Sequence, residues 1–337
     1  MSPEESTPLN GNSSYGAFDA ATEKEKSARR HAVNMHFQGS FWEDCVHFRE
    51  GSIPHSMVIA TAIGISCGVA AYLYYEGLWG LLEFLWKTIP EKYVIGVWPE
   101  WAYPFYIPLM GYAMSLLVGL SVKFLGDPGD LAHVIECVHE KGYIAIDHSL
   151  PMICASQFSI LGGGSLGPEA PLVAIAAAIS GFISRSVFHN CNRNIVRKHT
   201  LMGMAGALAA FFGCPLGGSL FALEVTSRLG MEYYEHAIEA IFCGEITLAV
   251  FRALTGLPIS SIWEITEEKL DGAKPYEIVL GILIGLLGGL TAYLFALFHE
   301  RVMGVFKSLN LMDESRAIPR ALLGGTVIIG LGLLVPN

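Results

Sequence analysis

Long stretches of this chain contain almost no charged side chains, and this feature limits what it can fold into. Four such stretches are apolar enough to cross a bilayer, the last one running to the end of the chain: Ser56–Tyr75, Pro104–Val122, Ile278–Phe298 and Ala321–Val335. The hydrocarbon core of a bilayer is about 30 Å thick, and an α-helix needs about 20 apolar residues to cross it. We therefore expect a membrane-spanning helix in each stretch, with the apolar character of the first one continuing to Trp86.

The composition agrees with a membrane protein and excludes several other classes. Of the 337 residues, 52% are apolar and 15% are charged. A soluble domain averages about 25% charged residues. The mean hydropathy is +0.46, and glycine is common inside the apolar stretches, as in tightly packed membrane helices. The net charge of -10 and the lack of a Lys/Arg stripe exclude a nucleic-acid-binding protein. These features predict an all-α, multi-pass integral membrane protein.

Two other apolar stretches are interrupted by glycine and proline where an ordinary span would continue. The first, Ser149–Ser184, contains one charged residue, Glu169, and the second, Thr200–Ser227, contains only Glu224. Irregular backbone is tolerated inside a membrane only where it is buried in protein or lines an aqueous site. We therefore expect broken or re-entrant helices here, as in transporters that bind ions near the bilayer centre. A further segment, Tyr233–Thr255, carries three glutamates and is a weaker candidate for a span.

An apolar pattern near the start of the chain is repeated near its end. Residues 63–73 align with residues 284–294 with six identities in eleven positions, and residues 109–115 give a similar apolar match with 322–328. Internal repeats are typical of transporter folds, although glycine-rich membrane helices can also look alike by chance. On this interpretation the second repeat is incomplete, and the chain corresponds to half of a longer protein.

The same pattern predicts four regions along the chain. A polar N-terminal tail is expected on the cytosolic side, and an acidic loop is expected to connect the two repeats. The predicted boundaries are 1–55 for the tail, 56–256 for the first membrane repeat, 257–275 for the loop and 276–337 for the start of the second repeat. A ligand site in such a protein is expected where the repeats meet.

The loop around Glu169 is the strongest candidate for an ion site. Pro168 and Pro171 suit the first turn of a helix, where a missing N–H costs nothing, and the preceding glycines let the backbone approach a ligand. A helix that begins inside the membrane directs free N–H groups and its positive dipole end at one point, which binds anions. Glu169 can occupy that point itself, so its protonation or displacement would admit a mobile anion. The alternative is that Glu169 only stabilises the helix N-terminus.

A second turn before a helix has the same character. Its four residues are Gly126, Asp127, Pro128 and Gly129. Asp130 follows them and is expected to be the N-cap of the next helix. The turn alone is an ordinary cap, but together with the Glu169 loop it could supply a second helix end to the same anion.

Other polar residues in the apolar stretches give weaker signals. Glu224 could relay protons or be a structural carboxylate, and the sequence leaves both open. Ser165 lies in a Gly-x-Ser-x-Gly motif, which in hydrolases follows a strand, so an intramembrane serine hydrolase is the enzymatic alternative. The seven cysteines and eleven histidines show no metal-ligand spacing, so we expect free thiols and neither a metal nor a cofactor.

At these residues the chain resembles the CLC family of chloride channels and proton-coupled anion exchangers. The family's GxEGP motif is matched, with alanine in place of the second glycine, by Gly167, Pro168, Glu169, Ala170 and Pro171. The segment Phe211–Glu224 is similar to the family's FNAPLAGxLFxxE segment. The resemblance implies an inverted-repeat membrane fold, a gating role for Glu169, and a homodimer in which each subunit has its own pore.

Two departures from the family pattern bear on the mechanism. The family's GSGIP anion-coordinating loop corresponds to residues 126–130, where Asp127 or Pro128 replaces the serine. Val225 stands where proton-coupled exchangers carry a glutamate, and an apolar side chain cannot carry a proton. The resemblance therefore implies transport of chloride or a similar small anion, by a channel in preference to a proton-coupled exchanger. Because the family's later anion-binding loop and pore tyrosine would lie beyond Asn337, a non-conducting chain that associates with longer subunits is a further alternative.

Overall fold

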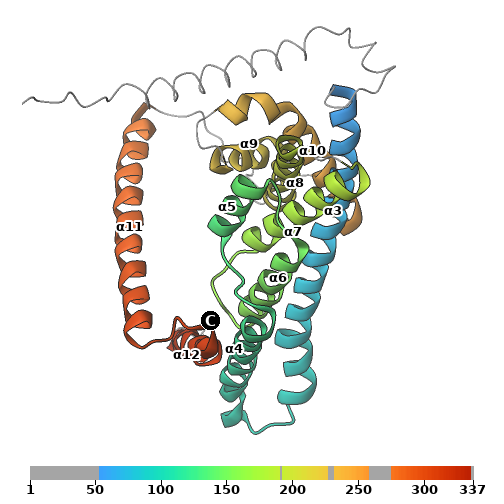
Figure 1. The fold of residues 1–337 in the computed structure, drawn as a ribbon. Helices are drawn as coiled ribbons and strands as arrows, with labels where there is room; N and C mark the ends of the chain where they lie inside the picture. The colour runs from blue at the N-terminus through green and yellow to red at the C-terminus, as the bar shows by residue number, and fades with distance from the viewer. Residues whose placement is uncertain (1–52, 190–191, 227–230, 258–274, 335–337) are drawn as a thin grey trace, which may run out of the picture. The chain divides into compact units, whose positions relative to one another are not determined.

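The computed structural model describes a helical protein over residues 53–189, 192–226, 231–257 and 275–334 (Figure 1). Every regular element in these ranges is helical, which confirms the predicted all-α fold class. The chain divides at Val58 into two units, and the described part of the first consists only of residues that begin the first helix. Nearly all of the predicted tail, 1–55, and of the predicted loop, 257–275, lies outside the described residues.

Four long apolar helices occupy the stretches that we predicted to span the membrane. They are α3 (Ile53–Glu83), α4 (Tyr106–Leu125), α11 (Pro275–Ser308) and α12 (Ala317–Leu334). Within the described ranges, five helical segments are long and apolar enough to cross a bilayer, and the additional one is Glu169–Val187. The helical segment that contains α3 extends to Val94, so it is longer than predicted.

The two interrupted stretches each form a pair of helices, with a break at the predicted glycines and prolines. Their bounds are α6 (Ile146–Leu161), α7 (Glu169–Phe182), α8 (Arg193–Phe212) and α9 (Pro215–Thr226). Proline at the first position of α9 has the φ angle of a helix and needs no N–H partner. The short α5 (Leu131–Lys141) precedes the first pair, and α10 (Met231–Thr255) covers the weaker candidate span.

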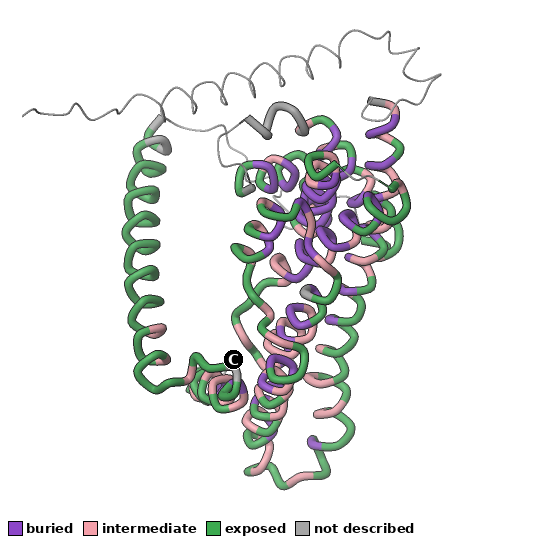
Figure 2. Tube along the Cα trace, viewed as in Figure 1, coloured by how far each residue is buried: buried purple, intermediate pink, exposed green. Residues whose placement is uncertain are grey.

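The core of the second unit is built around α8, which packs against α7, α9 and α10. Figure 2 shows that buried residues are concentrated in α7 and α8, and many of them are alanine or glycine. At Gly218 of α9 the two backbones come close together, since a Cβ atom there would lie 2.5 Å from the backbone nitrogen of Ala209 in α8. Small residues of this kind let two helix backbones approach closely. The resulting van der Waals contact is one of the main attractions between helices in a membrane.

The segments that repeat in the sequence lie within α3 and α4 in the first copy and within α11 and α12 in the second. α4 and α12 pack against each other in antiparallel directions, because Gly111 lies against Ile329 while Gly119 lies against Ile318. In both copies a long helix is followed by a shorter one, and the repeat stays a prediction.

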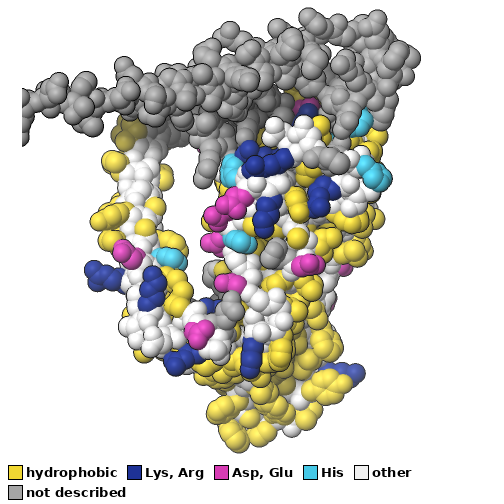
Figure 3. Space-filling model, in the orientation of Figure 1, with side chains coloured by type: hydrophobic (Ala, Val, Ile, Leu, Met, Phe, Trp, Pro, Cys, Tyr) yellow, Lys and Arg dark blue, Asp and Glu magenta, His cyan; other side chains and the backbone are white. Residues whose placement is uncertain are grey.

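The surface of the described residues is unusually apolar. In α11 every residue from Val279 to Arg301 is exposed, and most of them are hydrophobic (Figure 2). In Figure 3, hydrophobic side chains also cover the lower part of the view, where α3 ends and α4 begins, whereas acidic, basic and histidine side chains gather around α5. A helix that is hydrophobic on all sides is stable only in apolar surroundings. These surfaces fit a multi-pass protein in contact with lipid.

Replacing Gly218 with alanine is expected to destabilise the contact between α8 and α9, because the new methyl group would overlap the backbone at Ala209. Overpacking of this kind costs about 1–3 kcal/mol. The measurement is the thermal unfolding midpoint of the purified protein in detergent, which should fall. Gly288→Ala in α11 is the matched control, since no atom lies within 4 Å of a Cβ atom built there. Equal midpoints for the two variants would contradict the close α8–α9 contact.

Candidate functional site

The N-terminus of α7 lies directly after the break in the first interrupted stretch. The first backbone bond runs from the Leu172 N–H to the carbonyl of the N-cap residue, Pro168, over 3.0 Å. Pro168 and Pro171 have no N–H group. The amides of Glu169 and Ala170 are therefore the only N–H groups before Leu172 in this turn, and neither bonds to another described residue. They place the positive end of the helix dipole in the loop, as the sequence predicts.

The Glu169 carboxylate folds back over this helix end. A Cβ atom on Gly167 would overlap the carboxylate of Glu169, so the side chain occupies the space that only glycine leaves open. Glu169 is half-buried, and its carboxylate forms no hydrogen bond or ion pair with any residue in the described ranges. The one charged side chain of this apolar stretch is thus held beside free N–H groups without a cationic partner.

The loop before α7 is open to its surroundings. Gly163, Ser165, Leu166 and Gly167 are exposed. Ser165 follows a helix, α6, rather than the strand that a hydrolase nucleophile elbow requires. Its hydroxyl also makes no hydrogen bond in the part of the chain that the structure describes, so the Gly-x-Ser-x-Gly match has no supporting geometry.

The second predicted turn, residues 126–130, leads into α5, and its Asp127, Gly129 and Asp130 are exposed. The Asp130 carboxylate accepts a 2.8 Å hydrogen bond from the His133 amide, which confirms Asp130 as the N-cap. The Asp127 carboxylate accepts a bond from the Gly129 amide over 3.2 Å. Among the described residues, no hydrogen bond or ion pair joins this turn to the Glu169 loop. A shared anion site between the two helix ends stays a prediction.

Glu224 and Val225 lie in the last turns of α9, and both are exposed. Val225 lines an open cleft of about 500 Å³ together with residues of α5 and the start of α8. The titratable side chains in this cleft are Glu136, His139, Glu140 and Arg193. We did not single out these residues in the sequence, although His139 and Glu140 follow Glu136 by three and four residues and so lie next to it on α5.

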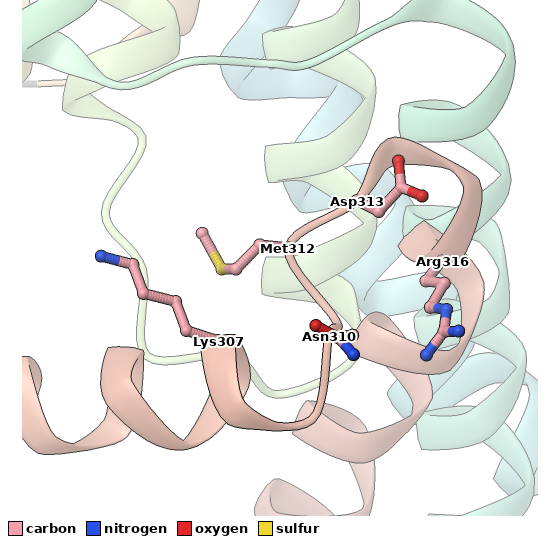
Figure 4. Close-up of a pocket in the computed structure, with 5 residues that line it drawn as sticks. All are labelled: Lys307, Asn310, Met312, Asp313 and Arg316. Carbon is pink, nitrogen blue, oxygen red and sulfur yellow. The ribbon is translucent and has the colours of Figure 1, made fainter.

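A second open pocket lies at the turn between α11 and α12. It is lined by Lys307, Asn310, Met312, Asp313 and Arg316. Figure 4 shows that Lys307 and Arg316 extend in different directions rather than toward a common point. None of the predicted site residues lines this pocket, so the Glu169 loop remains the candidate site.

The five cysteines in the described ranges are free thiols, as predicted. They are Cys67, Cys137, Cys154, Cys214 and Cys243. The structure therefore adds no disulfide to the interactions that hold these helices together.

Comparison with known proteins identifies the family. The family described as "Voltage gated chloride channel" matches residues 113–337, a range that contains both turns and Glu224. The chain is 26% identical, over 67% of its length, to a chloride/fluoride channel protein of Pseudomonas syringae pv. tomato. It is 32% identical, over 82% of its length, to the H(+)/Cl(-) exchange transporter ClcA of Cronobacter sakazakii. The chain spans 48% and 58% of these two relatives, or about half of their length. The chain belongs to the voltage-gated chloride channel family.

Proposed function

We propose that this chain forms part of the anion pathway of a chloride channel, in which Glu169 is the gate. The observation that carries the proposal is the position of the Glu169 carboxylate, which lies over Gly167 at the N-terminus of α7. A carboxylate with no partner among the described residues, beside free N–H groups, occupies a place suited to a mobile anion. Family membership supports chloride as the transported ion.

Gating follows from competition between two negative charges for one helix end. While Glu169 is ionised and folded over Gly167, it repels a chloride ion that approaches the same N–H groups. Protonation removes this charge, and rotation of the side chain away from Gly167 removes the obstruction. Chloride can then accept the hydrogen bonds of the Glu169 and Ala170 amides, which are strongest for a charged acceptor.

The turn at residues 126–130 is proposed as a second contact for the anion. A carboxylate accepts hydrogen bonds and cannot donate one, so Asp127 cannot replace the donor function of a serine hydroxyl. The Asp127 carboxylate instead engages the Gly129 amide. An anion that used this amide would have to displace Asp127, just as it would have to displace Glu169 in the other loop.

The relatives include both a channel and a proton exchanger by name, so the residues must decide between the two mechanisms. Val225 favours a channel, because its side chain cannot carry a proton. The alternative is an exchanger that uses other acids, and Glu136 and Glu140 line the cleft that Val225 also lines. The role of Glu224 stays open between a proton relay and a structural carboxylate.

We further propose a homodimer with one anion pathway in each subunit. Family membership supports it, and several apolar side chains of α9 and α10 are exposed in the single subunit and available for such a contact. They are Leu216, Phe221, Ile238 and Phe242. The alternative is that this chain conducts nothing alone and associates with a longer subunit.

Glu169→Gln is expected to abolish the pH dependence of chloride flux. In liposomes that contain the purified chain, wild-type flux should rise on acidification, because protonation neutralises the gate. The variant should conduct at pH 7 at least about fivefold faster than the wild type, since a charge at a helix end interacts by about 1 kcal/mol. Glu83→Gln, an exposed surface carboxylate, is the control and should leave flux unchanged. A retained pH response in Glu169→Gln would contradict the gate assignment.

Gly167→Ala provides a second test that keeps the carboxylate. Its methyl group would force Glu169 from the helix end, so flux should change in the same direction as in Glu169→Gln. Gly80→Ala is the matched control, because no atom lies within 4 Å of a Cβ atom built there. Normal gating in Gly167→Ala would show that the carboxylate position does not control the pathway.

Chloride flux through the wild-type chain is expected to drive no proton movement. The measurement records external pH while a chloride gradient dissipates across the liposome membrane. Proton movement in a fixed ratio to chloride would establish the exchanger alternative. Absence of chloride flux from this chain, with flux restored by a longer subunit, would favour the associating chain.

A further inference from the structure

The last turn of α6 ends directly before the loop that carries Glu169. The carbonyls of residues 158–161 have no helical partner, because the helix stops at Leu161. Three of them are satisfied by the amides of Gly162, Gly163 and Gly164, with N···O distances of 2.8 to 3.0 Å. Gly163 has φ +86°, which lets the chain turn back over the helix end. The carbonyl of Leu161 is the one that this turn does not reach.

Trp86 supplies the missing partner from a distant part of the chain. Its indole Nε1–H donates a 2.8 Å hydrogen bond to the Leu161 carbonyl, 75 residues away. Leu161 is 1% exposed, so its carbonyl would otherwise be a buried acceptor without a donor. Leaving such a group unpaired is costly. The Trp86 bond therefore completes the cap of α6 at the start of the gate loop.

Neighbouring residues hold the Trp86 ring in place. Trp86 lies in a short π-helical segment, Phe84–Thr88, and such segments often occur at functional sites. Its ring packs edge to face against Tyr106 of α4, with 6.0 Å between ring centroids. The Tyr106 hydroxyl in turn donates to the Leu85 carbonyl. The donor is thus positioned by two elements before it meets α6.

We propose that Trp86 is a positioning residue for the Glu169 gate, an inference that rests on the proposed function. The turn that Trp86 caps is continuous with the short loop, residues 162–168, that ends at Glu169. Met114 of α4 borders the turn at Gly162, and Ile328 of α12 borders it at Gly163. Trp86 therefore fixes the first end of the loop whose other end holds the carboxylate. Loosening this end shifts the balance between the blocked and open positions of Glu169.

Trp86→Phe tests the inference, because it keeps an aromatic ring and removes only the N–H donor and the second ring. Hydrogen–deuterium exchange of the Gly162–Gly164 amides should accelerate about fivefold, as for the loss of one typical hydrogen bond. Trp79→Phe is the matched control, since Trp79 lies on α3 shortly before this segment, is 54% exposed and makes no hydrogen bond to a described residue. Unchanged exchange in Trp86→Phe would overturn the inference, whatever the flux results.

Chloride flux then separates a positioning role from a merely structural one. Trp86→Phe should shift the pH at which chloride flux is half-maximal in the otherwise wild-type chain. In a chain that already carries Glu169→Gln, adding Trp86→Phe should leave the chloride flux unchanged. An equal loss of flux in both backgrounds, or an unshifted pH profile, would overturn the gate connection. A wild-type chain that conducts nothing would contradict the proposed function, and the exchange result would still decide whether Trp86 holds the turn.

Discussion

The break between α6 and α7 is the feature on which the proposed anion pathway depends. A continuous helix through this stretch would bond its backbone N–H groups internally and leave none for an anion. Three glycines end the first helix, and two prolines shape the first turn of the second, so the amides of Glu169 and Ala170 stay free. Because Gly167 has no side chain, the Glu169 carboxylate can fold back over this glycine at the start of the second helix. One local irregularity thus accounts for both the proposed anion site and its proposed occupant.

Much of this arrangement could be predicted from the sequence, because its causes are local. Apolar length predicted the helices α3, α4, α11 and α12, and glycine and proline predicted where the interrupted stretches divide. The Asp130 cap followed from residue type and position, and the structure confirms it. Each of these features depends on the nearest few residues, which a single sequence displays directly.

The remaining features depend on contacts between residues far apart in the chain. Nothing in the sequence near Trp86 indicates that its indole meets the carbonyl of Leu161, since the pairing depends on how α3 and α4 lie against α6. The cleft that places Val225 beside Glu136 likewise depends on the packing of α5 and α9. Such tertiary contacts cannot be predicted from residue type and spacing along the chain.

In the proposed mechanism, Glu169 and chloride compete for the N-terminus of α7. The most direct measurement is chloride binding to the purified protein by isothermal titration calorimetry at neutral pH, in the wild type and in Glu169→Gln. Competition predicts tighter chloride binding in the variant, because glutamine has no negative charge to compete with chloride. Equal or weaker binding in the variant would contradict competition between Glu169 and chloride.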